Sequence, residues 1–413
     1  MAEALAIWLS GTRVALVEQE RGKLRLAYTP EAMDRYPLGS PLLSLSLPLT
    51  SERYPQGVVR AFIDGLLPEG EPRRAAAADF ELVASDTFGL VRAIGRDCAG
   101  ALIIQPVDEP PPPSPTTLTA EPLSEADIVK LVGNLRSAPL GVSANVRISL
   151  AGMQEKLLLT QMPDGSWGRP VAGTPSTHIL KPEHPTYPDT VENEAFCMRV
   201  ARNLGLPVAS VKTTTIGGRR LLVVERYDRV VSPDGAVERL HQEDFCQALG
   251  IPPEKKYQEN GGPSLQRLGD VLQAAAGPDS IETLLQGVAV NVLLANGDAH
   301  GKNFSLLHAQ SGALVLAPFY DLMSTLPYGD DRLAMYVDDV RRTNRVTGDR
   351  IVNEAVKWGM SKRRAAEVVG DILARTPGAV EAARQETEDV PDGFPRTVES
   401  QLAQVRSSFA AAT

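Results

Sequence analysis

Residues 291–321, NVLLANGDAHGKNFSLLHAQSGALVLAPFYD, decide the fold that we expect for this chain. They continue an apolar run that includes Leu284, Leu285 and Val288, and then break into a polar turn at residues 296–303. Two short apolar runs follow, and the second ends at Asp321. This pattern predicts a helix that enters a loop, followed by two short strands, the second of which delivers an acid at its end. Polar residues this dense between buried segments are typical of a functional site.

The spacing inside this stretch indicates the kind of site. Asp298 and Asn303 are five residues apart (303 − 298 = 5), and Asp321 follows 23 residues after Asp298 (321 − 298 = 23). Kinase-type phosphoryl transfer needs an acid to accept the substrate's hydroxyl proton, and then an asparagine and a second acid as metal ligands, in that order along the chain. Lys302 adds a cation that could neutralise phosphate charge. The alternative is a solvated turn, because Asn, Gly and Asp are ordinary turn formers; the flanking buried runs and Asp321 favour the site.

Composition excludes several classes of protein. The 413 residues suffice for two or three domains, and 43% hydrophobic with 23% charged residues is ordinary for a soluble globular protein. A net charge of −9 disfavours direct DNA binding as the main activity. The three scattered cysteines form no metal motif and indicate reduced thiols in a cytoplasmic protein. No run reaches the roughly 18 apolar residues of a membrane helix, and we recognise no signal peptide.

Local patterns divide the chain into four segments. Residues 1–108 begin with three short strands joined by turns, which predicts a small β module, and residues 109–123 form a proline-rich linker. Residues 124–229 start with a capping box and contain a hairpin, a strand ending at a lysine, a helix and a second hairpin, the layout of a kinase amino-terminal lobe. Residues 230–413 are mostly helical, so the predicted class is α+β. Among the expected helices are residues 56–67, 73–80, 192–204, 242–249, 264–276, 280–294, 347–358, 361–375 and 397–408.

Several residues outside the central stretch are candidates for nucleotide binding. Lys181 ends a strand and could pair with phosphates, held by Glu192 or Glu194 on the next helix. The turn at residues 149–156 could cover phosphates with its backbone N–H groups, although it has one glycine and matches neither common phosphate-loop pattern. His300 either orients Asp298 or bonds a backbone carbonyl.

Taken together, these residues resemble the HipA family of serine/threonine protein kinases. The matching stretches cover nearly all the chain: residues 66–70, 95–101, 149–156, 178–181, 192–194, 224–229, 241–245, 296–305 and 320–321. The resemblance implies a two-lobed protein-kinase-like, HipA-like fold with an extra small β subdomain at the N-terminal end. It also implies an ATP-dependent kinase that serves as the toxin of a bacterial toxin–antitoxin pair, linked to growth arrest and persistence.

The resemblance also implies a role for each matching residue. Asp298 would be the catalytic base, Asn303 and Asp321 would bind Mg²⁺, and Ser149 would be an autophosphorylation site that switches the enzyme off. Glu225 and Tyr227 would hold adenine through their backbone, and Asp228 would lie near the ribose. The other predicted ATP contacts are Lys181, Ala151, Gly152, Met153, Gln154, Glu155, Lys156, His300 and Lys302. Met153 departs from the alanine that the family often has, and Tyr227 from its phenylalanine.

The partners that the resemblance implies are a HipB-like helix-turn-helix antitoxin, DNA only through that antitoxin, and a protein substrate of the aminoacyl-tRNA synthetase class. Two other classes remain open from the sequence. One is a catalytically weak kinase-fold protein that acts as a co-repressor or scaffold, and the complete set of catalytic groups argues against it. The other is a small-molecule kinase of the same fold.

Overall fold

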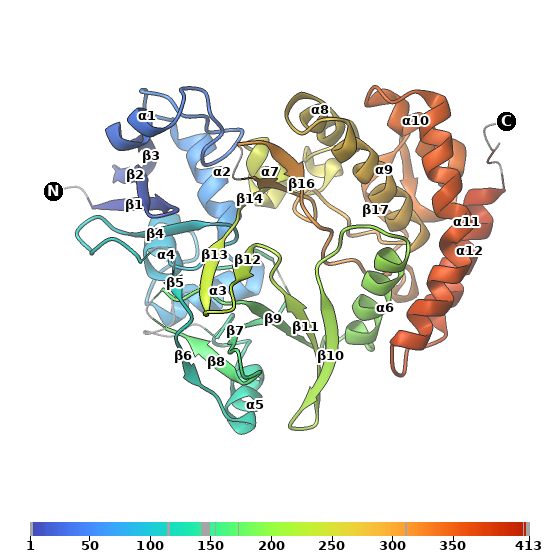
Figure 1. Ribbon diagram of the computed structural model, residues 1–413, viewed down its shortest axis with the longest axis horizontal. Coiled ribbons are helices and arrows are strands. Elements are labelled where there is room, and N and C mark those ends of the chain that lie inside the picture. The colour runs from blue at the N-terminus through green and yellow to red at the C-terminus, as the bar shows by residue number, and fades with distance from the viewer. Residues whose placement is uncertain are drawn as a thin grey trace. The chain divides into compact units, whose positions relative to one another are not determined.

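The computed structural model describes residues 3–113, 116–141, 149–152, 154–171, 173–309, 312–407 and 409. The chain forms two compact units, each made of two stretches of sequence (Figure 1). The first consists of Met1–Pro182 and Thr214–Glu254, and the second of Glu183–Thr213 and Lys255–Thr413. No helix among the described residues is long and apolar enough to cross a membrane.

The N-terminal part of the first unit is an antiparallel sheet covered by helices. The sheet has the order β3-β2-β1-β4. Its core includes the fully buried Ile7, Leu26 and Phe62. The predicted β module is therefore present, and α4, which follows an Asp86 N-cap, was not predicted. The elements are β1 (Ala4–Leu9), β2 (Thr12–Glu20), β3 (Lys23–Tyr28), α1 (Pro30–Arg35), α2 (Gln56–Leu66), α3 (Gly70–Asp79), α4 (Thr87–Ile94) and β4 (Leu102–Pro106).

A second sheet completes the first unit, with the order β10-β11-β9-β7-β8-β6. Helix α5 packs Ile128 and Val132 on Leu159, Leu180 and Val223 of this sheet. The predicted capping box is present, since Ser124 and Asp127 bond each other's backbone N–H groups. The elements are β6 (Ala120–Pro122), α5 (Glu125–Gly133), β7 (Leu157–Gln161), β8 (Trp167–Pro170), β9 (His178–Pro182), β10 (Val211–Ile216) and β11 (Arg219–Glu225). Smaller elements are β5 (Thr116–Thr117), β12 (Arg229–Val231), β13 (Ala236–Arg239), β14 (His241–Asp244) and α7 (Phe245–Ala248).

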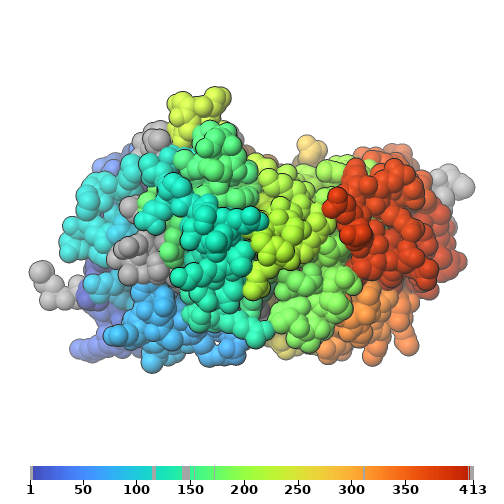
Figure 2. All heavy atoms as spheres, turned by 90° about the horizontal axis from the view of Figure 1, so that it is seen from below, coloured from blue at the N-terminus to red at the C-terminus, as the bar shows by residue number. Residues whose placement is uncertain are grey.

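Long helices dominate the second unit. Helix α6 lies against α11, and α11 lies against α9, α10 and α12; Figure 2 shows α6 (green) beside the two C-terminal helices (red). The helices are α6 (Thr190–Asn203), α8 (Leu265–Ala275), α9 (Pro278–Leu293), α10 (Gly348–Lys357), α11 (Lys362–Glu386) and α12 (Gly393–Arg406). Two hairpins accompany them, β15 (Ser305–His308) with β16 (Leu314–Leu316), and β17 (Arg332–Val337) with β18 (Val340–Arg342). Short 3-10 turns are η1 (Pro253–Lys255), η2 (Gln258–Asn260), η3 (Leu326–Tyr328) and η4 (Thr343–Arg345).

Two predicted helices need correction, and one hairpin was missed. The helix expected from residue 242 begins only at Phe245, because Asp244 and Gln247 form a capping box there and the preceding residues are strand β14. The helix expected to end at residue 375 continues to Glu386 through Pro377. Packing of α11 against α6 and α9 outweighs the hydrogen bond that the proline removes. Hairpin β17–β18 was not predicted, since residues 332–342 carry no clear alternation.

Candidate functional site

The loop after α9 is held in place by polar contacts on both sides. The Asn296 side-chain amide donates to Oδ1 of Asn291 at 2.7 Å, and its backbone N–H donates to the Asn291 carbonyl at 2.9 Å. Gly297 donates its N–H to Oγ1 of Thr325 at 2.9 Å. A Cβ at Gly297 would collide with the Arg332 carbonyl oxygen, so only glycine fits there. The predicted helix, loop and two strands are confirmed, but the second strand ends five residues before Asp321 instead of at it (321 − 316 = 5).

Asp298 combines solvent access with an unusual environment for its carboxylate. The residue is exposed, and its Oδ1 accepts a hydrogen bond from the Tyr257 hydroxyl at 2.6 Å. Many protein atoms nonetheless surround the carboxylate, and this loss of hydration raises its pKa to about 6. Tyr257 and Lys256 lower that pKa, whereas the like charges of Asp321 and Asp330 raise it. A carboxylate with such a pKa is matched to proton transfer near neutral pH.

The two predicted metal ligands, Asn303 and Asp321, lie side by side. Nδ2 of Asn303 donates to Oδ2 of Asp321 at 3.0 Å, and its Oδ1 accepts a weak bond from the His300 N–H at 3.3 Å. Asp321 has φ +59°, a left-handed conformation that is uncommon for a non-glycine residue and frequent at functional sites. The described residues contain no group of three or more His, Cys, Asp or Glu side chains that could hold a metal alone. One carboxylate and one amide suit Mg²⁺, which takes its remaining ligands from water and phosphate.

His300 and Lys302 flank this pair as buried residues, 6% and 7% exposed. Burial lowers the pKa of His300 well below its usual value, and the positive charge of Lys256 lowers it further, so the imidazole is neutral. Its Nδ1 has no hydrogen-bond partner among the described residues, and its ring meets the Tyr257 ring edge-on at 5.2 Å. Within the described part of the chain, His300 thus bonds neither Asp298 nor a carbonyl through Nδ1. The Lys302 carbonyl accepts from the Tyr320 hydroxyl at 2.6 Å.

In the first unit lie Lys181 and the turn at 149–156, for which phosphate contacts were predicted. Lys181 is 7% exposed and pairs with Leu222 across β9 and β11. Lys156 donates from Nζ to the Ala151 carbonyl at 2.6 Å, which closes the turn on itself, and Gly152 has φ +121°. Glu155 forms an ion pair with Arg136 at 3.1 Å. The predicted ATP contact of Gln154 stays a prediction. Met153 lies outside the described residues.

Ser149 is fully buried against the N-terminal part of its unit. Its hydroxyl donates to the Leu66 carbonyl at 2.6 Å, at the end of α2, and its N–H donates to the Asp97 carbonyl at 2.9 Å. The neighbouring Gly152 carbonyl accepts from the Glu69 N–H at 3.2 Å. The start of the turn is therefore docked on α2 and on the segment that follows it.

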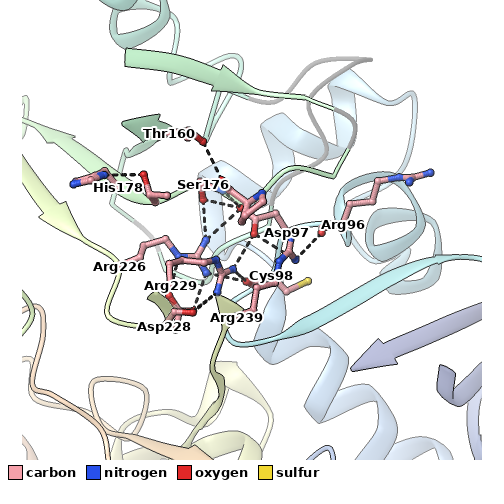
Figure 3. Close-up of polar contacts among 12 residues, drawn as sticks. Arg96, Asp97, Cys98, Thr160, Ser176, His178, Arg226, Asp228, Arg229 and Arg239 are labelled. Carbon is pink, nitrogen blue, oxygen red and sulfur yellow. Dashed lines mark hydrogen bonds and ion pairs between the residues drawn. The ribbon is translucent and has the colours of Figure 1, made fainter. Parts of the chain in front are cut away.

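The connector after β11 contains a cluster of buried charges, which Figure 3 shows in close-up. The Asp228 carboxylate, 2% exposed, receives two bonds from Arg226, at 3.0 and 2.8 Å, and one from the Gly100 N–H at 2.7 Å. It also accepts a hydrogen bond from the Gln242 side-chain amide at 3.2 Å and forms an ion pair with Arg229 at 3.1 Å. Burial alone would raise the pKa of Asp228, but Arg226 and Arg229 lower it below the usual range. These contacts, four of which are on Oδ2, give Asp228 a structural role, and the predicted ribose contact stays a prediction.

Asp97 is the second acid of the cluster. Its Oδ1 accepts from Arg229 at 2.8 Å, and its Oδ2 accepts from the N–H and the hydroxyl of Ser176 at 2.8 and 2.7 Å. Burial raises the pKa of Asp97, but Arg226, Arg229 and Arg239 outweigh it and bring the pKa to about 2. The cluster ties the segment after α4 to the connector.

The two residues predicted to hold adenine lie at the start of the connector. Glu225, at the end of β11, is exposed and pairs with His178 across the sheet, and the Tyr227 hydroxyl donates to the Gln242 side chain.

Two family models match this chain: the HipA N-terminal domain over residues 5–105 and the HipA-like C-terminal domain over residues 148–380. This chain belongs to the HipA family. Its relatives include Y4mE of Sinorhizobium fredii, 37% identical over 94% of this chain and 93% of that protein. Another is the serine/threonine-protein kinase toxin HipA of Shewanella oneidensis, 32% identical over 78% of this chain and 76% of that protein.

A solved structure of Shewanella oneidensis HipA, in complex with HipB and operator DNA, matches the HipA-family chain with a TM-score of 0.82. The match covers 97% of this chain and 95% of that chain at 26% identity. The predicted α+β, HipA-like fold, with its sheet-rich N-terminal part and helical C-terminal part, is thereby confirmed. The predicted boundaries of the four segments, and the predicted pairing of Lys181 with Glu192 or Glu194, stay predictions.

Sequence reasoning missed two groups of residues in this HipA-family chain. Tyr257 contacts Asp298 from 41 residues away (298 − 257 = 41), and no spacing rule connects them. Asp97 meets Arg226 across 129 residues of sequence. One signal was available for the second group: the run Arg226-Tyr227-Asp228-Arg229 places three charges directly after a buried strand, where charges need partners.

Proposed function

We propose that this HipA-family chain is an ATP-dependent serine/threonine protein kinase. The observation that carries the proposal is the loop after α9, where Asn303 and Asp321 are in contact and the nearby Asp298 has a raised pKa. An exposed carboxylate with a pKa of about 6 suits a base that accepts the proton of an attacking hydroxyl.

The remaining roles follow from the same chemistry. Asn303 and Asp321 would hold Mg²⁺, which neutralises charge on the transferred phosphate when it is bound. The buried ammonium groups of Lys181 and Lys302 would contact phosphates, together with the turn at residues 151–156. The backbone of Glu225 and Tyr227 would hold adenine. Asp228 would instead fix the connector, because its oxygens already accept several contacts from the chain.

We further propose that the kinase is the toxin of a bacterial toxin–antitoxin pair, acts in the cytoplasm and causes growth arrest and persistence. Support comes from the relative named a kinase toxin and from its complex with HipB and operator DNA. The net charge of −9 favours DNA contact through a HipB-like antitoxin that supplies the basic surface. The protein substrate that we expect is an aminoacyl-tRNA synthetase.

Autophosphorylation of Ser149 would serve as the off-switch. The Ser149 hydroxyl is fully buried and donates to a carbonyl oxygen, so a phosphate there would place acceptor oxygens against an acceptor. Phosphorylation is therefore incompatible with the docked turn, and the modified serine would have to leave its site. We expect one added phosphate by intact mass after incubation with Mg-ATP, and weaker ATP binding afterwards. Unchanged ATP affinity of the phosphorylated chain would overturn the switch.

The test of the kinase is incubation with γ-labelled ATP and bacterial lysate, with the Asp298→Asn variant alongside. The proposal predicts labelled protein bands with the wild type and none with the variant. Labelled small molecules without labelled protein would identify a small-molecule kinase. No transfer from either chain, together with binding to an antitoxin, would identify a co-repressor.

A further inference from the structure

Among the described residues, the Tyr257 hydroxyl is the one hydrogen-bond donor to the Asp298 carboxylate. The distance of 2.6 Å from the phenol oxygen to Oδ1 is that of a short bond to a charged acceptor. The second oxygen, Oδ2, accepts no bond from the described part of the chain. Tyr257 therefore occupies one side of the proposed base and leaves the other available.

Backbone hydrogen bonds hold Tyr257 in place beside the loop after α9. The Tyr257 carbonyl accepts from the N–H groups of Asn260 and Gly262, both at 3.0 Å, which forms the η2 turn. A Cβ at Gly262 would collide with the Lys255 carbonyl oxygen, so this turn needs a glycine there. Tyr257 is thus fixed by backbone contacts that any aromatic residue at this position would keep.

Two further contacts join this turn to the loop itself. The Gly301 N–H donates to the Lys256 carbonyl at 3.2 Å, and the Tyr257 ring packs edge-on against the His300 imidazole. Because no other side chain in the described ranges donates to Asp298, its rotamer depends on the Tyr257 hydroxyl. A base must be held within hydrogen-bond reach of the proton it accepts, because small displacements are costly in rate.

We propose that Tyr257 is a positioning residue, which holds Asp298 by Oδ1 so that Oδ2 accepts the proton of the substrate hydroxyl. The inference rests on the proposed function, since it assigns Asp298 as the base. The hydroxyl also stabilises the carboxylate form, in the same direction as Lys256 and against Asp321 and Asp330. Neutral His300 packs on the Tyr257 ring and adds no charge.

The test compares the wild type with Tyr257→Phe, which removes only the hydroxyl and keeps the ring. The first measurement needs no activity: the ¹³C carboxyl shift of Asp298 is titrated, with Asp298→Asn to assign the signal. We expect the pKa of Asp298 to rise by about one unit in Tyr257→Phe, since a donor to the charged form is lost. An unchanged pKa would overturn the inference.

The second measurement is the rate at which γ-phosphate leaves Mg-ATP, to protein or to water, over a range of ATP concentrations and pH. For Tyr257→Phe we expect kcat to fall about 10- to 100-fold with KM for ATP unchanged. The acid limb of the pH profile should move to higher pH. Equal kcat and the same acid limb in both chains would contradict the positioning role.

Tyr187→Phe is the matched control, because Tyr187 is a half-exposed tyrosine of the same unit. We expect wild-type rates from it, and a loss equal to that of Tyr257→Phe would contradict a role specific to Tyr257. If the wild type releases no phosphate, the proposed function fails. The carboxyl titration then still decides whether Tyr257 controls Asp298.

Discussion

The chain places two pairs of aspartates in opposite environments. Asp97 and Asp228 lie in the first unit, 1% and 2% exposed, among three arginines. In the second unit, Asp298 is exposed and Asp321 half-buried. The pKa values of the first pair are lowered, whereas that of Asp298 is raised to about 6.

The difference shows that charge partners, rather than burial alone, decide what an acid does. Loss of hydration raises the pKa of Asp97 and of Asp298 alike, but guanidinium groups reverse the effect only around Asp97. Carboxylates saturated by arginines cannot exchange protons or bind a metal near neutral pH, so they hold the fold. A carboxylate with one hydroxyl donor keeps an oxygen available for chemistry.

Among the substitutions outside the proposed base, the largest expected effect is on metal-dependent nucleotide binding. Asp321→Asn removes the one carboxylate of the proposed Mg²⁺ pair, so Mg²⁺-dependent ATP binding should weaken and phosphate transfer should fall on the order of 10³-fold. ATP affinity is measured by calorimetry with and without Mg²⁺. In the absence of the metal, both chains should bind alike. Equal Mg-ATP affinity in the two chains would remove Asp321 from the metal role.

Removal of a buried acid should act on stability instead. Asp97→Asn leaves three buried arginines, Arg226, Arg229 and Arg239, with Asp228 as the remaining acid of the cluster. The excess positive charge in the core should cost roughly 3–5 kcal/mol in the unfolding free energy. The urea midpoint of the variant reports this loss. Asp164→Asn, at an exposed hairpin turn, is the control and should keep the wild-type midpoint. If both variants unfold at the same urea concentration, the cluster does not hold the fold.

The lowered pKa of Asp97 also predicts that the stability of the chain depends on pH. The pKa of Asp97 is lower in the folded chain, about 2, than in the unfolded chain, about 4, so its stabilisation is complete above pH 4 and is lost as pH falls toward 2. The loss amounts to roughly 2 kcal/mol for this one group. Acid unfolding followed by circular dichroism should show Asp97→Asn less sensitive to pH in this window. Parallel pH curves for the two chains would argue against the arginine partners of Asp97 as the cause.

The smallest effect is expected where an acid–arginine pair is exposed. Asp371 and Arg375 pair at 3.1 Å on α11, with side chains 59% and 47% exposed. Asp371→Asn should change the unfolding free energy by about 0.5 kcal/mol or less, because water screens the pair. A change as large as that of Asp97→Asn would mean that burial does not distinguish the two sites.

The sequence predicted well those features that residues close together along the chain determine. The predicted site brought Asn303 and Asp321 together, and they are in contact because a hairpin connects them. Helix ends were predicted where capping signals are local, as at Ser124. Contacts between distant segments were not predicted: Tyr257 with Asp298, and Asp228 with Gly100. The second contact also gives Asp228 a structural role that no local pattern reveals.

The most direct test of this account measures γ-phosphate transfer and the melting temperature together, for the wild type, Asp298→Asn and Asp97→Asn. The account predicts that Asp298→Asn loses roughly 10²- to 10⁴-fold in transfer and keeps the wild-type melting temperature. It predicts that Asp97→Asn melts several degrees lower. Transfer that persists in Asp298→Asn, or a loss of stability in that variant as large as in Asp97→Asn, would contradict the assignment of chemistry to one pair and structure to the other.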